Sequence, residues 1–149
     1  MAPAFFIGLM SGTSLDGVDG VMAQIDNTGR LRVTAHAFVA FQVPFRDALL
    51  QLNQSGPDEL HRSALAGNAI ARHYAQVVQA LLQSTDLSPE HVVAIGAHGQ
   101  TVRHRPLEFD ADPSIGQSAV GYTLQLNNPA LLAELTGIDV IAEFRTRDL

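Results

Sequence analysis

The first part of the chain alternates between apolar runs and short polar turns, which predicts three β-strands joined by tight loops. An apolar run over residues 5–10 stops at the polar turn Ser11–Gly17, and apolar residues resume over 18–25. Turn-forming residues bounded by apolar runs are typical of a strand, a tight loop and a second strand. After a turn at 27–29, alternation with a period of two over 30–41 predicts a third strand.

The middle of the chain has the periodicity of helices. Pro44 opens a short helical stretch that ends near Asn53, and a break at 54–57 precedes a long helical pattern from Asp58 to about Ser84. Its apolar positions form one broad face, which we expect to be buried. They are Leu60, Ala64, Leu65, Ile70, Ala71, Tyr74, Val78, Leu81 and Leu82.

A continuous apolar run over residues 92–96 predicts a buried strand by its length and its branched side chains. This strand is expected to end in the polar segment His98–Arg105. The turn-rich segment 107–121 is expected to form a mobile loop, and residues 122–126 a short strand.

The C-terminal part predicts a helix followed by a strand. Asn128 is an N-cap with Pro129 at the first helical position, and Gly137 ends the helix. Residues 138–144 then predict a last strand, followed by a charged cluster over 145–148. A strand that ends in such a cluster usually leads into a loop and further structure.

Composition narrows the possible chemistry. The length of 149 residues suits one domain, and 46% hydrophobic residues suffice for a core. A net charge of −6 argues against a nucleic-acid-binding surface. The absence of cysteine excludes disulfides, thiolate zinc sites and a cysteine nucleophile.

All nine basic residues are arginines, so the chain holds neither a Walker-A lysine nor a Schiff-base lysine. Bound phosphate must therefore be held by backbone N–H groups, hydroxyls, arginine or a metal ion. The N-terminal apolar run is too short to span a membrane and has no basic residues before it, so it fits neither a signal peptide nor a transmembrane helix. We therefore expect a cytoplasmic protein without a membrane partner.

Three polar clusters follow strand-like runs, at Ser11–Asp19, His98–Arg105 and Arg145–Asp148. Ligand sites of open α/β sheets lie beyond the carboxyl ends of strands, so the three clusters could converge on one crevice. Equally, strands end at the surface, where polar residues belong in any case. The spacing alone leaves both interpretations open.

The first cluster has the composition of a phosphate-binding loop. Gly12 and Gly17 allow positive φ and a close approach of the backbone to a ligand. Two hydroxyls and one carboxylate lie between them, and such groups bind phosphate or a hydrated divalent cation. Asp16 and Asp19 could hold magnesium through water. The alternative is an ordinary hairpin turn with polar side chains.

The other clusters carry weaker signals. His98 and His104 lack a convincing metal-ligand spacing, and no G-x-S-x-G motif marks Ser11 or Ser14 as a hydrolase nucleophile. Asp148 could be a general base, although carboxylates near a terminus are commonly just solvated.

Three segments resemble the motifs of the anhydro-N-acetylmuramic acid kinase family, in the family's order and across essentially the whole chain. They are IGLMSGTSLDGVD at 7–19, GAHGQTVRHRP at 96–106 and LQLNNPALLAELTGIDVIAEFRTRD at 124–148. The chain has Asn127 where the family typically has glycine, Glu143 where it commonly has aspartate, and Leu135 where arginine is frequent.

The resemblance implies an α/β fold. It implies a ribonuclease-H-like lobe of the actin and Hsp70 type, with a mixed sheet flanked by helices, forming the first half of a two-lobe kinase. Family members are much longer, so residues 1–149 are expected to be the N-terminal lobe, truncated before the C-terminal nucleotide-binding lobe.

The resemblance also implies an activity and its residues. ATP would phosphorylate the 6-hydroxyl of 1,6-anhydro-N-acetylmuramic acid while water opens the anhydro ring, in amino sugar metabolism and peptidoglycan recycling. Asp148 would be the general base that activates the water, and Mg²⁺ would lie near Asp16 or Asp19. The phosphate-binding loop would comprise Gly12, Thr13, Ser14, Leu15, Asp16, Gly17, Val18 and Asp19. The residues orienting the sugar or its lactyl carboxylate would be Gln100, Thr101, Arg103 and Arg145.

A second hypothesis is not enzymatic. A chain of this length would be an inactive truncated lobe or a non-catalytic module that binds sugar or phosphate, because phosphoryl transfer depends on positioning between two lobes. The face that normally packs on the other lobe would then be exposed and apolar, which favours self-association and a possible homodimer.

Overall fold

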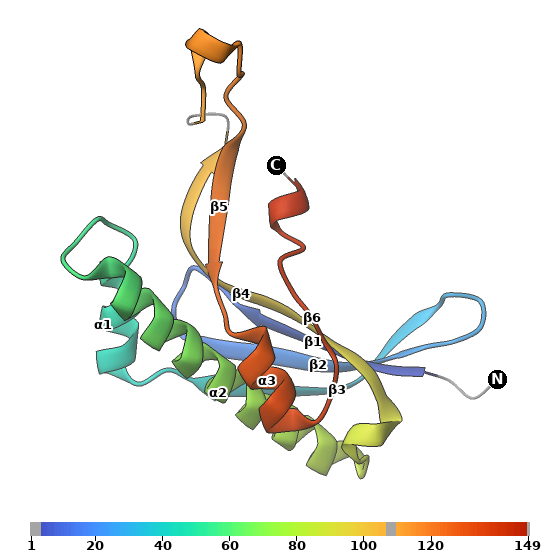
Figure 1. Cartoon of the computed structure of the whole chain (residues 1–149). Coiled ribbons are helices and arrows are strands. Elements are labelled where there is room, and N and C mark those ends of the chain that lie inside the picture. Colours follow the sequence, from blue (N-terminus) through green and yellow to red (C-terminus); the bar gives the residue numbers. More distant parts are fainter. Residues whose placement is uncertain (1–3, 107–109, 149) are drawn as a thin grey trace.

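The computed structural model describes residues 4–106 and 110–148, and it shows a six-stranded mixed sheet with three α-helices (Figure 1). The strands are β1 (Ala4–Ser11), β2 (Gly17–Ile25), β3 (Leu31–Ala40), β4 (Val92–Pro106), β5 (Gly121–Leu126) and β6 (Val140–Ile141). The helices are α1 (Val43–Gln51), α2 (Glu59–Thr85) and α3 (Pro129–Thr136), with short 3₁₀ turns η1 (Pro89–His91), η2 (Pro113–Ile115) and η3 (Thr146–Asp148). The expected α/β class and mixed sheet are confirmed.

The sheet has the order β3-β2-β1-β4-β5, and β6 also pairs with β4. β1, β2 and β3 form an antiparallel meander, whereas β1 and β6 both run parallel to β4. The first part of β4 lies between β1 and β6, and its second part pairs with β5 from Gln100 to Pro106. β4 and β5 therefore extend together as an arm beyond the sheet (Figure 1).

The core lies between the sheet and α2. Gly20 on β2 allows the two to come close, because a Cβ there would lie 2.3 Å from Cγ1 of Val77. Tyr74 is fully buried, and its hydroxyl accepts a hydrogen bond from the backbone N–H of Gly99 at 2.8 Å. Burial raises the pKa of the Tyr74 hydroxyl. Helix α2 thus packs against the β1–β3 meander and is hydrogen-bonded to β4.

The prediction that the apolar face of the long helix is buried is wrong for the first turns of the helix. Leu60 is 90% exposed and Leu65 is 55% exposed, and Ala64 is exposed as well. The buried residues of α2 begin only at Ala66, so the hydrophobic core does not cover the first two turns of the helix. An apolar periodicity identifies the face of a helix but not the length over which the sheet covers it.

The predicted end of the fourth strand is also wrong. β4 continues through His98–Arg105 to Pro106, because β5 supplies a second pairing partner for this polar segment. The predicted loop follows, and its residues 107–109 lie outside the described part of the chain. Its mobility stays a prediction. The remainder contains the turn Pro113–Ile115, closed by a bridge between Asp112 and Gln117.

The last strand is shorter than predicted, covering only Val140–Ile141. The extended conformation stops before Glu143, which has a φ of +63° in the left-handed region. This region costs an L-residue about 1–2 kcal/mol. We therefore expect Glu143→Gly to raise the free energy of unfolding by about 0.5–1 kcal/mol, since strain relief exceeds the added chain entropy.

Urea denaturation of the two proteins measures this difference. Glu134→Gly is the matched control, because Glu134 lies inside α3, where glycine lowers helix stability by about 1 kcal/mol. Equal losses for both variants would contradict the assignment of strain to position 143.

In the part of the chain that the structure describes, all three α-helices lie on one side of the sheet, and no helix covers the opposite side (Figure 1). Side chains alternate between the two sides, so Ile7 and Leu9 are buried under α2 while Met10 is exposed. Phe38, Ile141 and Phe144 are large exposed apolar residues as well. The structure therefore leaves an apolar sheet surface without a helix over it.

We expect this uncovered surface to cause self-association of the 149-residue chain. Sedimentation velocity should show a weight-average mass that rises with concentration, and Met10→Ser with Phe38→Ser should reduce the rise. Leu60→Ser is the control, because Leu60 is exposed on α2 and away from this surface. A constant monomer mass over a wide concentration range would refute the expectation.

In the part of the chain that the structure describes, no helix combines the length and the apolar character needed to cross a bilayer.

Candidate functional site

The glycine-framed loop between β1 and β2 is a tight turn. The backbone N–H of Leu15 donates to the carbonyl of Gly12 at 3.2 Å, and the Leu15 side chain is buried. Positive φ falls on Leu15, at +55°, and not on Gly12 or Gly17 as the sequence predicted. Position 17 requires glycine because of close packing and not because of its φ angle. A Cβ there would lie 2.3 Å from the carbonyl oxygen of Val39.

The hydroxyl of Ser14 and the carboxylate of Asp16 form a pair on this loop. Ser14 Oγ donates to Asp16 Oδ1 at 2.6 Å. This bond, with backbone N–H groups of the loop, lowers the pKa of the exposed Asp16 carboxyl. The carboxylate is therefore ionised at neutral pH and open to solvent, as a hydrated cation would require.

Ser14→Ala should move the pKa of Asp16 upward, toward its ordinary value, because the variant removes the main group that stabilises the ionised form. Carboxyl ¹³C shifts followed through a pH titration measure the change. Thr28→Ala is the control, since Thr28 makes the equivalent bond to Asp26 on another turn. An unchanged Asp16 titration in Ser14→Ala would show that the backbone alone lowers the pKa.

Asp19 lies apart from Asp16, on β2 and on the uncovered side of the sheet. Its Oδ1 is 3.0 Å from Nε2 of His36, and both side chains are exposed. Among the described residues, no group of three or more His, Asp or Glu side chains is placed to hold a metal ion. Val18 between them is fully buried, so only its backbone could meet a ligand. A magnesium role for the two carboxylates stays a prediction.

A buried hydrogen bond joins the first predicted cluster to the second. Ser11 Oγ donates to Oε1 of Gln100, and both side chains are buried. Leu9 lies opposite Ala97 and Ser11 opposite Gln100, so β4 contains one extra residue between the two pairs. Gly99, with a φ of +81°, forms this bulge. The bulge brings Gln100 to the same side as Ser11, where its side chain is only 1% exposed.

Arg103 is held by an internal ion pair. Its Nη2 is 2.6 Å from Oε1 of Glu59, with side chains 11% and 34% exposed respectively. Its Nη1 donates to the carbonyls of Leu52 and Val102. The Arg103 guanidinium is thus mostly buried and already oriented. Glu59 was not predicted from the sequence, because it lies 44 positions from Arg103 at the start of an ordinary helix.

A pocket of about 220 Å³ lies where the glycine loop meets β4. One of its lining residues is Thr101, whose hydroxyl accepts a hydrogen bond from Nε2 of Gln125 at 3.1 Å. The lining residues are Thr13, Leu15, Asn53, Gln100, Thr101, Val102, Arg103 and His104. The structure therefore brings the first two predicted clusters together. Asn53 and Gln125 were missed, although Gln125 belongs to the third motif segment.

The third cluster lies against the arm. η3 contacts β5, and the ring of Phe144 is 6.0 Å from that of His98 on β4. Arg145 Nη1 is 3.2 Å from Asp148 Oδ2, so the two predicted site residues are each other's ion-pair partner. The Asp148 carboxylate remains mostly exposed. This cluster is near β4 and β5, but it does not line the 220 Å³ pocket.

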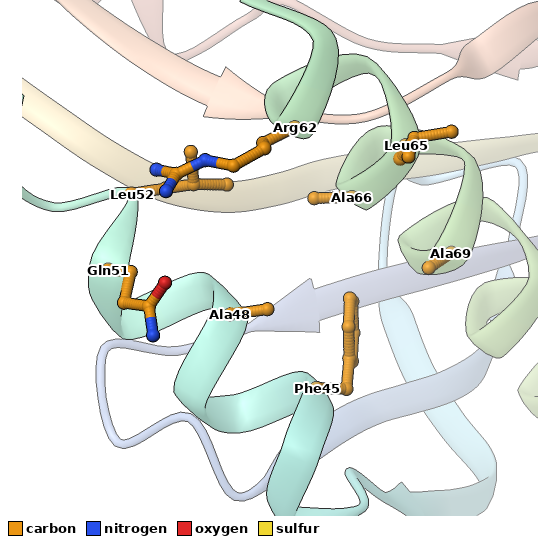
Figure 2. Close-up of a pocket in the computed structure, with 8 residues that line it drawn as sticks. All are labelled: Phe45, Ala48, Gln51, Leu52, Arg62, Leu65, Ala66 and Ala69. Carbon is orange, nitrogen blue, oxygen red and sulfur yellow. The ribbon is translucent and has the colours of Figure 1, made fainter. Parts of the chain in front are cut away.

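A second pocket, of about 310 Å³, lies between α1 and α2 (Figure 2). Its walls are mainly apolar, with Gln51 and Arg62 as the polar exceptions. The residues lining it are Phe45, Ala48, Gln51, Leu52, Arg62, Leu65, Ala66 and Ala69. Leu52 connects the two regions, because its side chain lines this pocket while its carbonyl accepts from Arg103.

Comparison with known proteins gives a consistent result. The family model described as anhydro-N-acetylmuramic acid kinase matches residues 4–149. A protein named anhydro-N-acetylmuramic acid kinase from Variovorax paradoxus is 58% identical over all of this chain and 37% of its own length. Proteins of the same name from Bordetella petrii and Cupriavidus metallidurans are 56% and 51% identical, each over 97% of this chain.

This chain spans little more than a third of the length of these curated relatives, between 35% and 37%. It matches their N-terminal part. The match covers all three motif segments, including the glycine loop, the β4 segment with Arg103, and the Arg145–Asp148 cluster. The chain belongs to the anhydro-N-acetylmuramic acid kinase family.

Proposed function

We propose that this chain is the N-terminal part of a kinase that phosphorylates 1,6-anhydro-N-acetylmuramic acid at the expense of ATP. The water oxygen bonds to C1, the bond from C1 to O6 breaks, and O6 bonds to the γ-phosphorus as ADP leaves. The proton released by the water passes to a carboxylate. The product is N-acetylmuramic acid 6-phosphate, which places the protein in cytoplasmic recycling of peptidoglycan.

The observation that carries the proposal is the pocket between the glycine loop and β4, in a chain of this family. The loop places Thr13 in the lining of this pocket, and its backbone N–H groups and the Thr13 hydroxyl would donate to phosphate oxygens, which suits a chain without lysine. Arg103 lines the same pocket, and its guanidinium is a planar fork of donors, the geometry that pairs bidentately with a carboxylate such as the lactyl group of the sugar.

The exposed and ionised Asp16 carboxylate fits a hydrated divalent cation, and Asp19 is a second oxygen donor nearby in sequence. Mg²⁺ bound there would neutralise charge that develops on the phosphates. Asp148 accepts the proton of the attacking water, and its ion pair with Arg145 orients that carboxylate. Thr101, fixed by Gln125, and the buried Gln100 shape the sugar side of the pocket.

The experiment is a coupled assay of ADP release with the anhydro sugar, ATP and Mg²⁺. It compares this 149-residue chain, the longest reading frame that contains it, and the Variovorax relative as a positive control. We expect turnover in the long form and none in the 149-residue chain, because phosphoryl transfer needs groups placed on both sides of the phosphate. No turnover in a folded long form would refute the proposed activity.

A second candidate is a binding module without turnover, because the pocket between the glycine loop and β4 is formed within these residues. In that case the long form would show no ADP release, while the 149-residue chain would still bind the anhydro sugar. ADP release by the long form distinguishes the two functions, and titration of the ¹⁵N-labelled chain with the sugar tests the binding at Thr101 and Arg103 that both functions require.

A further inference from the structure

Two guanidinium groups lie near the carboxylate of Glu59. Arg103 on β4 pairs with it, as described above, and Arg62 follows it by three residues on α2, so both α2 side chains project from the same side of the helix. Gly56 lies close to the side chains of both Glu59 and Arg62. Its backbone N–H donates to Glu59 Oε2 at 3.3 Å, and a Cβ at Gly56 would lie 3.5 Å from Arg62 Nη2.

The two guanidinium groups differ in the acceptors that they have. Arg103 takes the carboxylate and two backbone carbonyls, whereas Nε and Nη2 of Arg62 are buried with no acceptor among the described residues. Nε and Nη2 form the edge of the guanidinium that presents two parallel N–H groups, which a carboxylate can accept together. Figure 2 shows the Arg62 side chain reaching from α2 toward Leu52, whose carbonyl accepts from Arg103.

We propose that Arg62 is a positioning residue for Arg103 and receives the Glu59 carboxylate when Arg103 turns to an anionic ligand. This inference rests on the proposed function, in which Arg103 binds the sugar's carboxylate. The exchange replaces one ion pair by two, Glu59 with Arg62 and the ligand with Arg103. Glu59 is partly exposed and at the start of its helix, so its side chain is free to change partners.

The exchange explains why two donors are buried without an acceptor among the described residues. Unpaired charged donors in a protein interior are costly, so the state shown by the structure favours any movement that gives them an acceptor. Without Arg62, releasing Arg103 would leave Glu59 unpaired beside the incoming carboxylate, and ligand binding would be weakened. With Arg62 present, its positive charge offsets the repulsion between the Glu59 carboxylate and the carboxylate of the ligand.

The exchange can be tested on the 149-residue chain itself. Glu59→Gln, Arg62→Gln and the double variant are unfolded in urea, first in the wild-type background and then in the Arg103→Gln background. We expect additive effects with Arg103 present, and coupling with Arg103 absent, where either substitution removes the same Glu59–Arg62 pair. Additivity in both backgrounds, or coupling in both, would overturn the inference.

The Nε–H resonance of Arg62 provides a readout that does not depend on stability. In Arg103→Gln, exchange of this proton with solvent should slow by about tenfold, because the Nε–H group gains a charged acceptor. The same proton should be unchanged in the Arg103→Gln, Glu59→Gln double variant. Equal exchange rates in all three proteins would overturn the inference even where the urea data are compromised by poor folding.

In the longest reading frame, Arg62→Gln should raise KM for the anhydro sugar by about tenfold, the effect of one lost charged hydrogen bond, with kcat nearly unchanged. In the Glu59→Gln background, Arg62→Gln should no longer raise KM. Arg62→Gln should also leave KM unchanged for a sugar analogue that lacks the lactyl carboxylate. Arg72→Gln is the control, because Arg72 is exposed on the same helix and bonds only to the carbonyl of Asn68 among the described residues.

Different results would refute the proposed function and the exchange of partners. If Arg103→Gln leaves KM for the sugar unchanged, Arg103 does not bind the carboxylate, and that part of the proposed function is wrong together with the exchange. If Arg103→Gln raises KM while Arg62→Gln does not, the proposed function stands and the exchange alone is refuted.

Discussion

Asp148→Asn should reduce turnover of the anhydro sugar by about 10²–10⁴-fold in the full-length protein, the usual contribution of a general base. The amide keeps the shape of the carboxylate but cannot take the proton of the attacking water. Nucleotide affinity should stay unchanged, because the glycine loop, which we propose as the phosphate site, is on another element and Asp148 does not line its pocket. Single-turnover ADP release measures the chemistry, and binding of a fluorescent nucleotide measures the affinity.

Asp139→Asn is the matched control for this variant. Asp139 is an exposed carboxylate in the same C-terminal segment, just before β6, and its backbone carbonyl accepts from Ile95 without use of the side chain. The control should therefore retain wild-type turnover. Normal turnover in Asp148→Asn would remove Asp148 from the chemistry, and a loss of nucleotide affinity would assign it to the nucleotide instead.

Much of the fold could be predicted because local chemistry and tertiary structure agree there. The helix α3 begins as its sequence indicates, with the Asn128 side chain accepting from the backbone N–H of Leu131 at 3.0 Å. It ends at Gly137 with a φ of +68°, the left-handed conformation that glycine adopts without strain. The first two strands and their turn are equally local, since apolar runs and turn residues alternate without interruption.

The remainder depends on contacts between distant segments, which a single sequence does not show. The length of β4 is set by pairing with β5, and the bulge at Gly99 places Gln100 against Ser11 across 89 positions. Periodicity cannot reveal a bulge, because one extra residue reverses which side chains are buried. The Glu59–Arg103 pair was missed for the same reason, although Arg103 itself was predicted.

Gly20→Ala should lower the free energy of unfolding by about 1–3 kcal/mol, the cost of overpacking a dense core. The added methyl group would lie 2.3 Å from Val77 Cγ1 and 2.9 Å from Leu9 Cδ2, so these side chains or the elements that carry them must shift. Gly20 is on β2, the strand that follows the glycine loop for which we propose phosphate binding. A shift of β2 would reach this loop, and nucleotide affinity should then fall as well.

Gly8→Ala is the control that separates overpacking from the general effect of replacing a strand glycine. Gly8 lies on the neighbouring strand, and a Cβ there would meet only Val21 Cγ2, at an ordinary 3.5 Å. Because alanine also restricts the unfolded chain, Gly8→Ala should leave stability unchanged or slightly raise it. Thermal unfolding of both variants makes the comparison. Similar midpoints would mean that the core has room at Gly20, and that the close contact between α2 and β2 does not determine the position of the loop.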